Sequence, residues 1–87
     1  MPIDFSQVKA GDILPVQPAD KEIKLFLERQ GYLVGMAAQV LEISEPIESF
    51  NPRTGTDDTY LHIVVTNGKR PLEFGVRKSE GYHSDYF

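Results

Sequence analysis

The clearest alternation of apolar and polar positions lies in TYLHIVVTNGKRPLEFGV, residues 59–76. Two β-rich runs flank Asn67-Gly68, a pair that is typical of a tight hairpin turn. Because side chains alternate between the two faces of a strand, one face of this hairpin is nearly all apolar. Its members are Leu61, Ile63, Val65, Leu72 and Phe74. The opposite face is mostly polar, so the sequence predicts a half-buried antiparallel pair of strands.

Pro71 affects the register of this hairpin. A two-residue turn hydrogen-bonds Val64 with Pro71, yet proline has no amide hydrogen to donate. A four-residue turn keeps the same faces and pairs Val65 with Leu72 instead. In either register Pro71 predicts that the second strand lies at the edge of the sheet or starts one or two residues later.

The first half of the chain predicts a short strand followed by a helix. Residues 13–16 follow a Gly-Asp turn, and Pro15 predicts that this strand is short and at an edge. Residues 21–30, KEIKLFLERQ, show a partial strand alternation, but their composition and apolar spacing favour a helix. Asp20 is suited to cap its start, and Gly31 stands where a left-handed cap ends a helix.

The middle of the chain is less regular. Residues 32–43, YLVGMAAQVLEI, carry apolar groups on both alternating faces and predict a central strand, with a second helix over residues 35–41 as the competing interpretation. Residues 44–58 hold two prolines, a glycine and many polar side chains. They predict a long loop with room for a short strand at residues 47–50.

These elements predict an α+β fold in which one helix packs on a small, mostly antiparallel sheet of four or five strands. The alternative is a small all-β barrel in which residues 21–30 form a strand. The chain of 87 residues has the length of a single domain, residues 1–87.

Composition narrows the function classes. The chain has no cysteine, which excludes disulfides, thiolate zinc sites and thiol catalysis. Its net charge of −4 disfavours non-specific binding to nucleic acid. The opening stretch, residues 1–9, resembles no secretory leader, and no apolar run is long enough to span a membrane, so we expect a cytoplasmic protein. A small core without covalent links favours a homo-oligomer.

Few residues form a recognisable catalytic or metal pattern. His62 and Glu73 fall opposite each other in the two-residue register, and a cross-strand pair that supports the sheet explains them better than catalysis. His83 and Asp85 match no metal-binding spacing. We therefore expect a non-enzymatic protein with no cofactor and no bound metal.

The aromatic tail, residues 79–87, is the strongest candidate for an interaction site. Tyr82, Tyr86 and Phe87 are costly to leave in water, and aromatic residues are favoured at interfaces. The tail has three possible arrangements: it caps its own core, it swaps onto a partner subunit, or it is a mobile recognition segment. Lys69 and Arg70, beside the edge strand, are further interaction candidates.

The sequence therefore predicts a protein-interaction or regulatory module that binds through the sheet edge, the long loop or the aromatic tail. The alternative is a small-ligand domain with a pocket between helix and sheet near Gly35, Met36 and Tyr60. The third interpretation is a weak nucleic-acid binder, which would use a set of four basic residues. They are Lys69, Arg70, Arg77 and Lys78.

Overall fold

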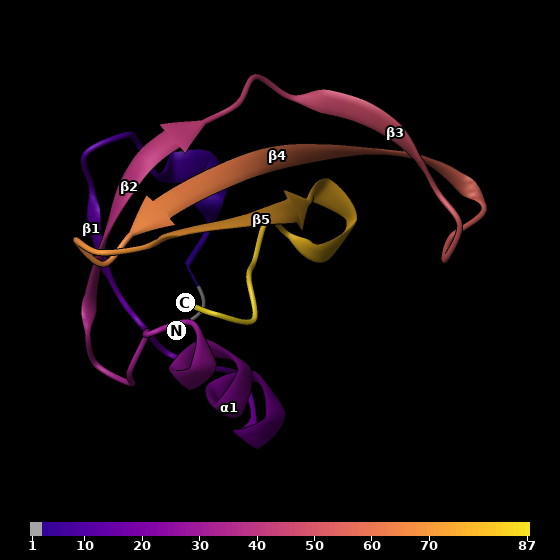
Figure 1. Cartoon of the computed structure of the whole chain (residues 1–87). Helices are drawn as coiled ribbons and strands as arrows, with labels where there is room; N and C mark the ends of the chain where they lie inside the picture. Colours follow the sequence, from indigo (N-terminus) through magenta and orange to yellow (C-terminus); the bar gives the residue numbers. More distant parts are fainter. Residues whose placement is uncertain (1–2) are drawn as a thin grey trace.

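The computed structural model describes residues 3–87, which form one α-helix and a five-stranded antiparallel sheet that does not close into a barrel (Figure 1). The elements are η1 (Phe5–Gln7), β1 (Ile13–Pro15), α1 (Lys21–Arg29), β2 (Ala37–Ile43), β3 (Ile47–Asn51), β4 (Thr56–Thr66), β5 (Pro71–Arg77) and η2 (Lys78–Glu80). The predicted α+β class is confirmed. Residues 1 and 2, part of the predicted domain and of the opening stretch compared with a leader, lie outside the described residues.

The long strand β4 organises the sheet. On one side its C-terminal half pairs with β2 and its N-terminal half pairs with β3, whereas its other side pairs with β5. β1 adds to the far side of β2. β3 and the part of β4 that pairs with it, residues 47–60, extend away from the other strands and are called the arm below (Figure 1).

Of the two predicted registers, the hairpin of β4 and β5 has the one with a four-residue turn. His62 therefore pairs with Gly75, and the direct pairing of His62 with Glu73 expected in the two-residue register is wrong. Val65 pairs with Leu72, Ile63 pairs with Phe74, and residues 67–70 form the turn. The predicted apolar face is the core face, since Ile63 and Val65 are fully buried and Phe74 packs against the buried cluster. The expected edge position of β5 is also observed, because within residues 3–87 it pairs only with β4.

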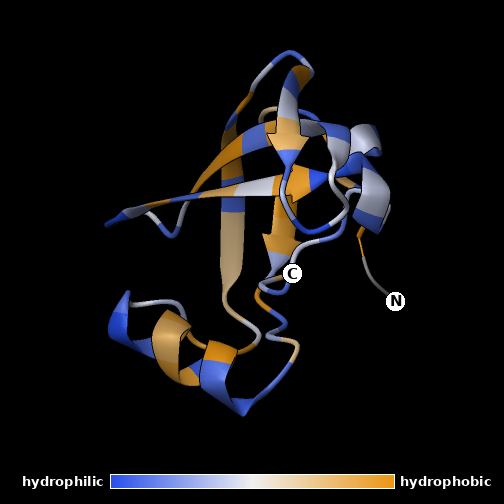
Figure 2. Ribbon diagram, turned by 90° about the vertical axis from the view of Figure 1, so that its right-hand side faces the viewer, coloured by the Kyte–Doolittle hydropathy of each residue, from blue (hydrophilic) through white to orange (hydrophobic). Residues whose placement is uncertain are grey.

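The helix begins and ends as the sequence predicts. Asp20 accepts a hydrogen bond of 2.9 Å from the Ile23 amide at the start. Gly31 has a φ of +87°, and the Tyr32 amide donates to the Leu27 carbonyl at 2.8 Å. This hydrogen bond closes a Schellman motif. Figure 2 shows apolar and hydrophilic residues following one another along α1, of which only Leu27 is buried.

Two predicted segments are wrong in extent. The strand expected over residues 32–43 starts only at Ala37, because the Met36 amide bonds to the Leu33 carbonyl in a turn where Gly35 has a φ of +81°. The loop expected over residues 44–58 is shorter than predicted: the short strand expected within it at residues 47–50 is confirmed as β3, but β4 already begins at Thr56.

The reason for the second difference is long-range pairing. All of β3 pairs with the first part of β4, which begins at Thr56, so the connecting turn covers only residues 52–55. The prolines and glycine that suggested a loop stand before β3 or in this turn, where they do not interrupt the ladder.

Candidate functional site

The outer edge of β5 carries backbone groups that no other strand uses. On β4, the His62 amide donates to Ser44 Oγ at 2.8 Å, and the His62 carbonyl accepts from the Ser44 amide at 2.9 Å. Both backbone groups of His62 therefore point toward the end of β2. Since this direction alternates along a strand, the groups of Leu61 and Ile63 point toward β5.

The partners of those residues on β5 are Val76 and Phe74. By the same alternation, the amide and carbonyl groups of Glu73 and Gly75 point away from β4. The Arg77 carbonyl confirms this direction, because it accepts from the Tyr82 amide at 2.9 Å, outside the ladder. Within residues 3–87, the structure shows no hydrogen-bond partner for the backbone groups of Glu73 or Gly75.

A hollow of about 520 Å³ lies along this open edge. Its lining comes from β5, from the tail and from α1: Ile23, Glu73, Phe74, Gly75, Glu80, His83, Ser84, Asp85 and Tyr86. A neighbouring hollow of about 500 Å³ shares Gly75, Glu80 and Asp85 with the first and continues toward the arm. We call the two together the edge groove.

The part of the edge groove beside β5 is acidic. Glu73, Glu80 and Asp85 line it, and its lining contains no lysine or arginine. His62 Nε2 lies 3.7 Å from Glu73 Oε1, and Arg53 Nη1 lies 3.4 Å from Glu80 Oε1, so two of these carboxylates have a cationic or titratable neighbour. The neighbouring hollow is mixed in charge, because Arg53 and Arg77 also line it.

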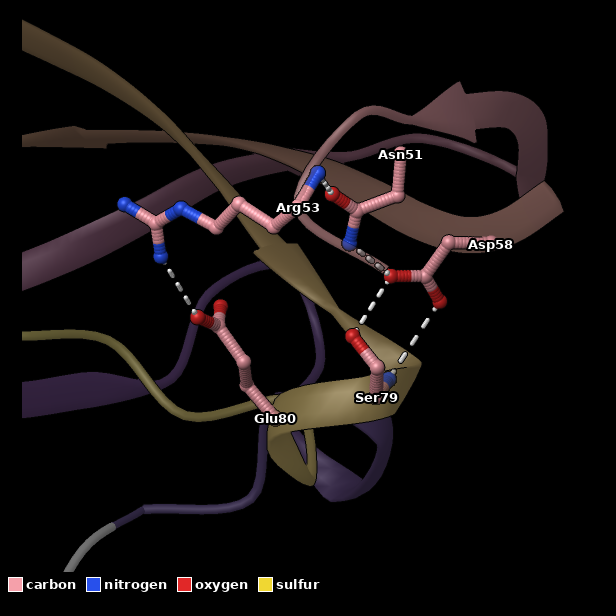
Figure 3. A network of polar contacts seen from close by, with 5 residues as sticks. All are labelled: Asn51, Arg53, Asp58, Ser79 and Glu80. Carbon is pink, nitrogen blue, oxygen red and sulfur yellow. Dashed lines mark hydrogen bonds and ion pairs between the residues drawn. The ribbon is translucent and has the colours of Figure 1, made fainter. Parts of the chain in front are cut away.

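A polar network joins the arm to η2 at one end of the groove (Figure 3). The Asp58 carboxylate accepts from Ser79 Oγ at 2.6 Å, from Asn51 Nδ2 at 3.0 Å and from the Thr59 amide at 2.8 Å. Asn51 is buried, and its side-chain oxygen accepts from the Arg53 amide at 3.0 Å. The network fixes η2, and with it Glu80, against the arm.

The attachment of the arm to η2 is expected to weaken in acid. The hydrogen bond from Ser79 Oγ, together with those from Asn51 and two backbone amides, holds the pKa of Asp58 below its usual value of 3.8. A carboxyl whose pKa is lower in the folded state stabilises that state above the unfolded value, and this contribution is lost as the pH falls through the folded pKa. Proton-exchange NMR of the Ser79 and Thr59 amides should show the arm opening below a pH of about 4.

Two variants test this assignment. Asp58→Asn should open the arm at neutral pH and remove the acid transition there. Asp4→Asn is the matched control, because hydrogen bonds from Ser6 also lower the pKa of Asp4, far from the arm in the sequence. If Asp4→Asn abolished the acid opening of the arm and Asp58→Asn did not, Asp58 would not be the titrating group.

The aromatic tail packs on its own core, which is one of the three predicted arrangements. The Tyr86 carbonyl accepts from the Gln17 amide at 2.9 Å, and the chain ends between α1 and the sheet (Figure 1). Phe87 is 3% exposed, so as an interaction residue it is corrected to a core residue. Tyr82 is half-buried, whereas Tyr86 stacks on Phe26 and lines the edge groove.

The predicted basic residues do not form one surface. Lys69 and Arg70 lie in the turn that precedes β5, and Arg77 and Lys78 lie at its other end. Six strand residues, 71–76, separate the pairs, a distance of roughly 20 Å. A nucleic-acid strand would therefore not meet a continuous basic patch on β5.

The three predicted pocket residues are not brought together. Tyr60 lines the hollow beside the arm, but Gly35 and Met36 stand in the turn before β2 and line neither hollow of the edge groove. Tyr60 is therefore the one of the three that borders the edge groove.

Residues 3–87 contain neither a metal-ligand cluster nor a membrane-spanning helix. No group of three or more histidine and acidic side chains is placed to hold a metal ion. In the same part of the chain, no helix has the length and apolar character that crossing a membrane requires.

Sequence reasoning missed the outward-facing backbone groups of Glu73 and Gly75, although Pro71 carried the signal. The direction of the backbone amide and carbonyl groups alternates along a strand, and Pro71, Glu73 and Gly75 occupy every second position of β5. If the backbone of Pro71 faces away from β4, the backbone groups of Glu73 and Gly75 do so as well. By contrast, Asn51, Asp58 and Ser79 are spread over two strands and η2, and no local pattern relates them.

Comparisons of this chain with protein-family models, with curated proteins and with solved structures find no match, so its function is inferred from its own geometry.

Proposed function

We propose that this protein is a non-enzymatic interaction module that binds an extended segment of a partner protein along the open edge of β5. The observation that carries the proposal is the pair of outward-facing residues Glu73 and Gly75, whose free backbone groups border the edge groove. An extended peptide that adds a strand to a sheet uses donors and acceptors of this kind for affinity and adjacent hollows for selectivity.

The surroundings of β5 favour this edge over the others. β1 has only three residues and includes Pro15, which offers no amide. β3 exposes the backbone groups of Glu48 and Phe50 by the same alternation, but it belongs to the protruding arm. Beside β5, α1 and the tail supply a second wall, through Ile23 and Tyr86.

A non-enzymatic role is supported by the way the polar side chains are used. The closest group of them, Asn51, Asp58 and Ser79, is engaged in mutual hydrogen bonds that fix η2. Within the described residues, no buried side-chain nitrogen or oxygen lacks a partner. Buried polar groups that are hydrogen-bonded in this way hold the fold together.

Gly75→Pro is expected to weaken binding of an extended peptide by about tenfold, because proline removes an outward amide and places its ring on the edge. The probe is a short neutral peptide in which threonine alternates with valine, and the readout is NMR titration of the isotope-labelled protein. In the unsubstituted protein the Glu73 and Gly75 amide signals should shift and become protected from exchange with solvent.

Glu48→Pro is the matched control, since it removes an outward amide from the edge of β3. The proposal is wrong if both proline variants bind the peptide as the unsubstituted chain does, or if the signals that shift belong to α1 or the arm alone. Light scattering of the same variants checks for a second copy of the chain: a dimer that Gly75→Pro dissociates would identify the bound segment as β5 of another copy.

A further inference from the structure

We infer that the segment received by β5 carries a lysine or arginine side chain where it passes Gly75, and that Glu80 and Asp85 select this cation. The inference rests on the proposed function and specifies the chemistry of the partner. Three observations support it. Gly75 leaves space at the edge, carboxylates surround that space, and their charge disfavours a second copy of this chain or a nucleic acid as the partner.

Gly75 provides space rather than an unusual backbone conformation. Six other glycines of the described chain have a positive φ, but Gly75 does not. A Cβ built on it would meet Tyr60 Cδ2 at 3.7 Å and the Leu61 carbonyl oxygen at 3.8 Å, which are ordinary contacts. A glycine of this kind in a strand leaves room for another chain to approach closely.

The floor of this space suits a long side chain with a charged end. Tyr60 lies on the same face of the sheet as Gly75, and both line the groove. The alkyl stem of a lysine or arginine can cover a tyrosine ring while its charge reaches the polar surroundings. Both hollows share Gly75, Glu80 and Asp85, so the two carboxylates border the space above the glycine.

Of the two carboxylates that border this space, one has an ion-pair partner in the described chain and the other has none. Arg53 lies 3.4 Å from Glu80, and Arg77 lines the hollow beside the arm, whereas Asp85 has no ion-pair partner in residues 3–87. On the side of β5, Glu73 adds a third carboxylate, and the lining there contains His83 but no lysine or arginine. A cationic side chain would neutralise part of this negative potential, and a neutral one would not.

The same charges disfavour the other occupants of a sheet edge. A second copy of this chain would bring another set of acidic residues to the groove and a second net charge of −4. A nucleic acid would bring phosphates against the carboxylates. A cationic, extended protein segment is the partner that satisfies both the backbone groups and the charge.

The test uses three short peptides of alternating threonine and valine whose central outward residue is lysine, threonine or glutamate. We expect the lysine peptide to bind about threefold to fivefold more tightly than the threonine peptide, and the glutamate peptide to bind more weakly than both. The lysine advantage should shrink in high salt, because the carboxylates are near the surface. Fluorescence anisotropy gives the affinities, and NMR shifts of Glu73 and Gly75 verify the site.

Asp85→Asn, and the double variant with Glu80→Gln, should abolish the lysine preference, measured as the ratio of the affinities for the lysine and threonine peptides. Glu48→Gln, on the outer edge of β3, is the control that should retain the preference. Equal affinities for all three peptides, with the shifts still at Glu73 and Gly75, would overturn the inference alone. If none of the peptides moved those signals, the proposed function itself would fail.

Discussion

Phe87→Ala is expected to lower the free energy of unfolding by about 3–5 kcal/mol, the range for truncation of a buried phenylalanine. The Phe87 ring is 3% exposed, and its centroid lies 6.2 Å from that of Phe5 and 5.6 Å from that of Phe74. The alanine would leave a cavity between β5 and the N-terminal segment. Urea unfolding followed by circular dichroism measures the change, and the melting temperature should fall by roughly 15–30 °C.

The matched control is Phe50→Ala, since Phe50 lies on the arm and is 58% exposed. Removal of an exposed ring is expected to change stability by no more than about 0.5 kcal/mol. Equal effects of the two substitutions would mean that the tail does not contribute to the core in solution. In that case the tail would instead be either mobile or bound to a partner subunit.

Elements fixed by nearby residues are the ones that the sequence predicts well. Asp20 and Gly31 determine the ends of α1 through hydrogen bonds to residues within five positions. The four-residue turn at residues 67–70 is similarly local, because Asn67 Oδ1 accepts from the amides of Lys69 and Arg70 at 2.9 Å. The alternation along β4 and β5 then fixes the core face without any distant information.

The arm shows why residues 44–58 were harder to interpret. Aspartate is disfavoured in strands, and Asp57 and Asp58 made β4 appear to begin later than it does. Asp58 tolerates the strand because Ser79, 21 residues away, donates to its carboxylate. Such a contact depends on the three-dimensional path of the chain and leaves no periodic signal.

The candidate site also has one part that local residues predict and another part that depends on long-range contacts. Pro71 is a local signal for an outward-facing edge, and it leads directly to Glu73 and Gly75. The second wall of the groove requires Ile23 on α1 and Asp85 in the tail to approach β5. The tail could be placed only once Phe87 was seen to fill the space beside Phe5, since the sequence is compatible with three positions for it.

Tyr32→Ala is expected to cost about 3–5 kcal/mol, because Tyr32 is fully buried between the end of α1 and the sheet. Its hydroxyl donates to the Arg70 carbonyl, which lies in the turn before β5. Tyr32→Phe keeps the ring and removes only the hydroxyl, with its hydrogen bonds to the carbonyls of Arg70 and Val65, so a cost of about 1–2 kcal/mol is expected. The difference between the two variants in urea unfolding separates packing from hydrogen bonding.

The same residue makes a prediction for alkaline pH. Burial raises the pKa of Tyr32 above its usual value of 10.0, which means that the folded state favours the neutral hydroxyl. The stability that this provides is present below the unfolded pKa and is lost as the pH rises through the folded one. Unfolding measured on both sides of pH 10 should therefore show a steeper alkaline loss in the unsubstituted chain than in Tyr32→Phe. If the unsubstituted chain and Tyr32→Phe lost stability in parallel, the Tyr32 hydroxyl would be hydrated. Packing alone would then hold α1, which carries Ile23, to the sheet.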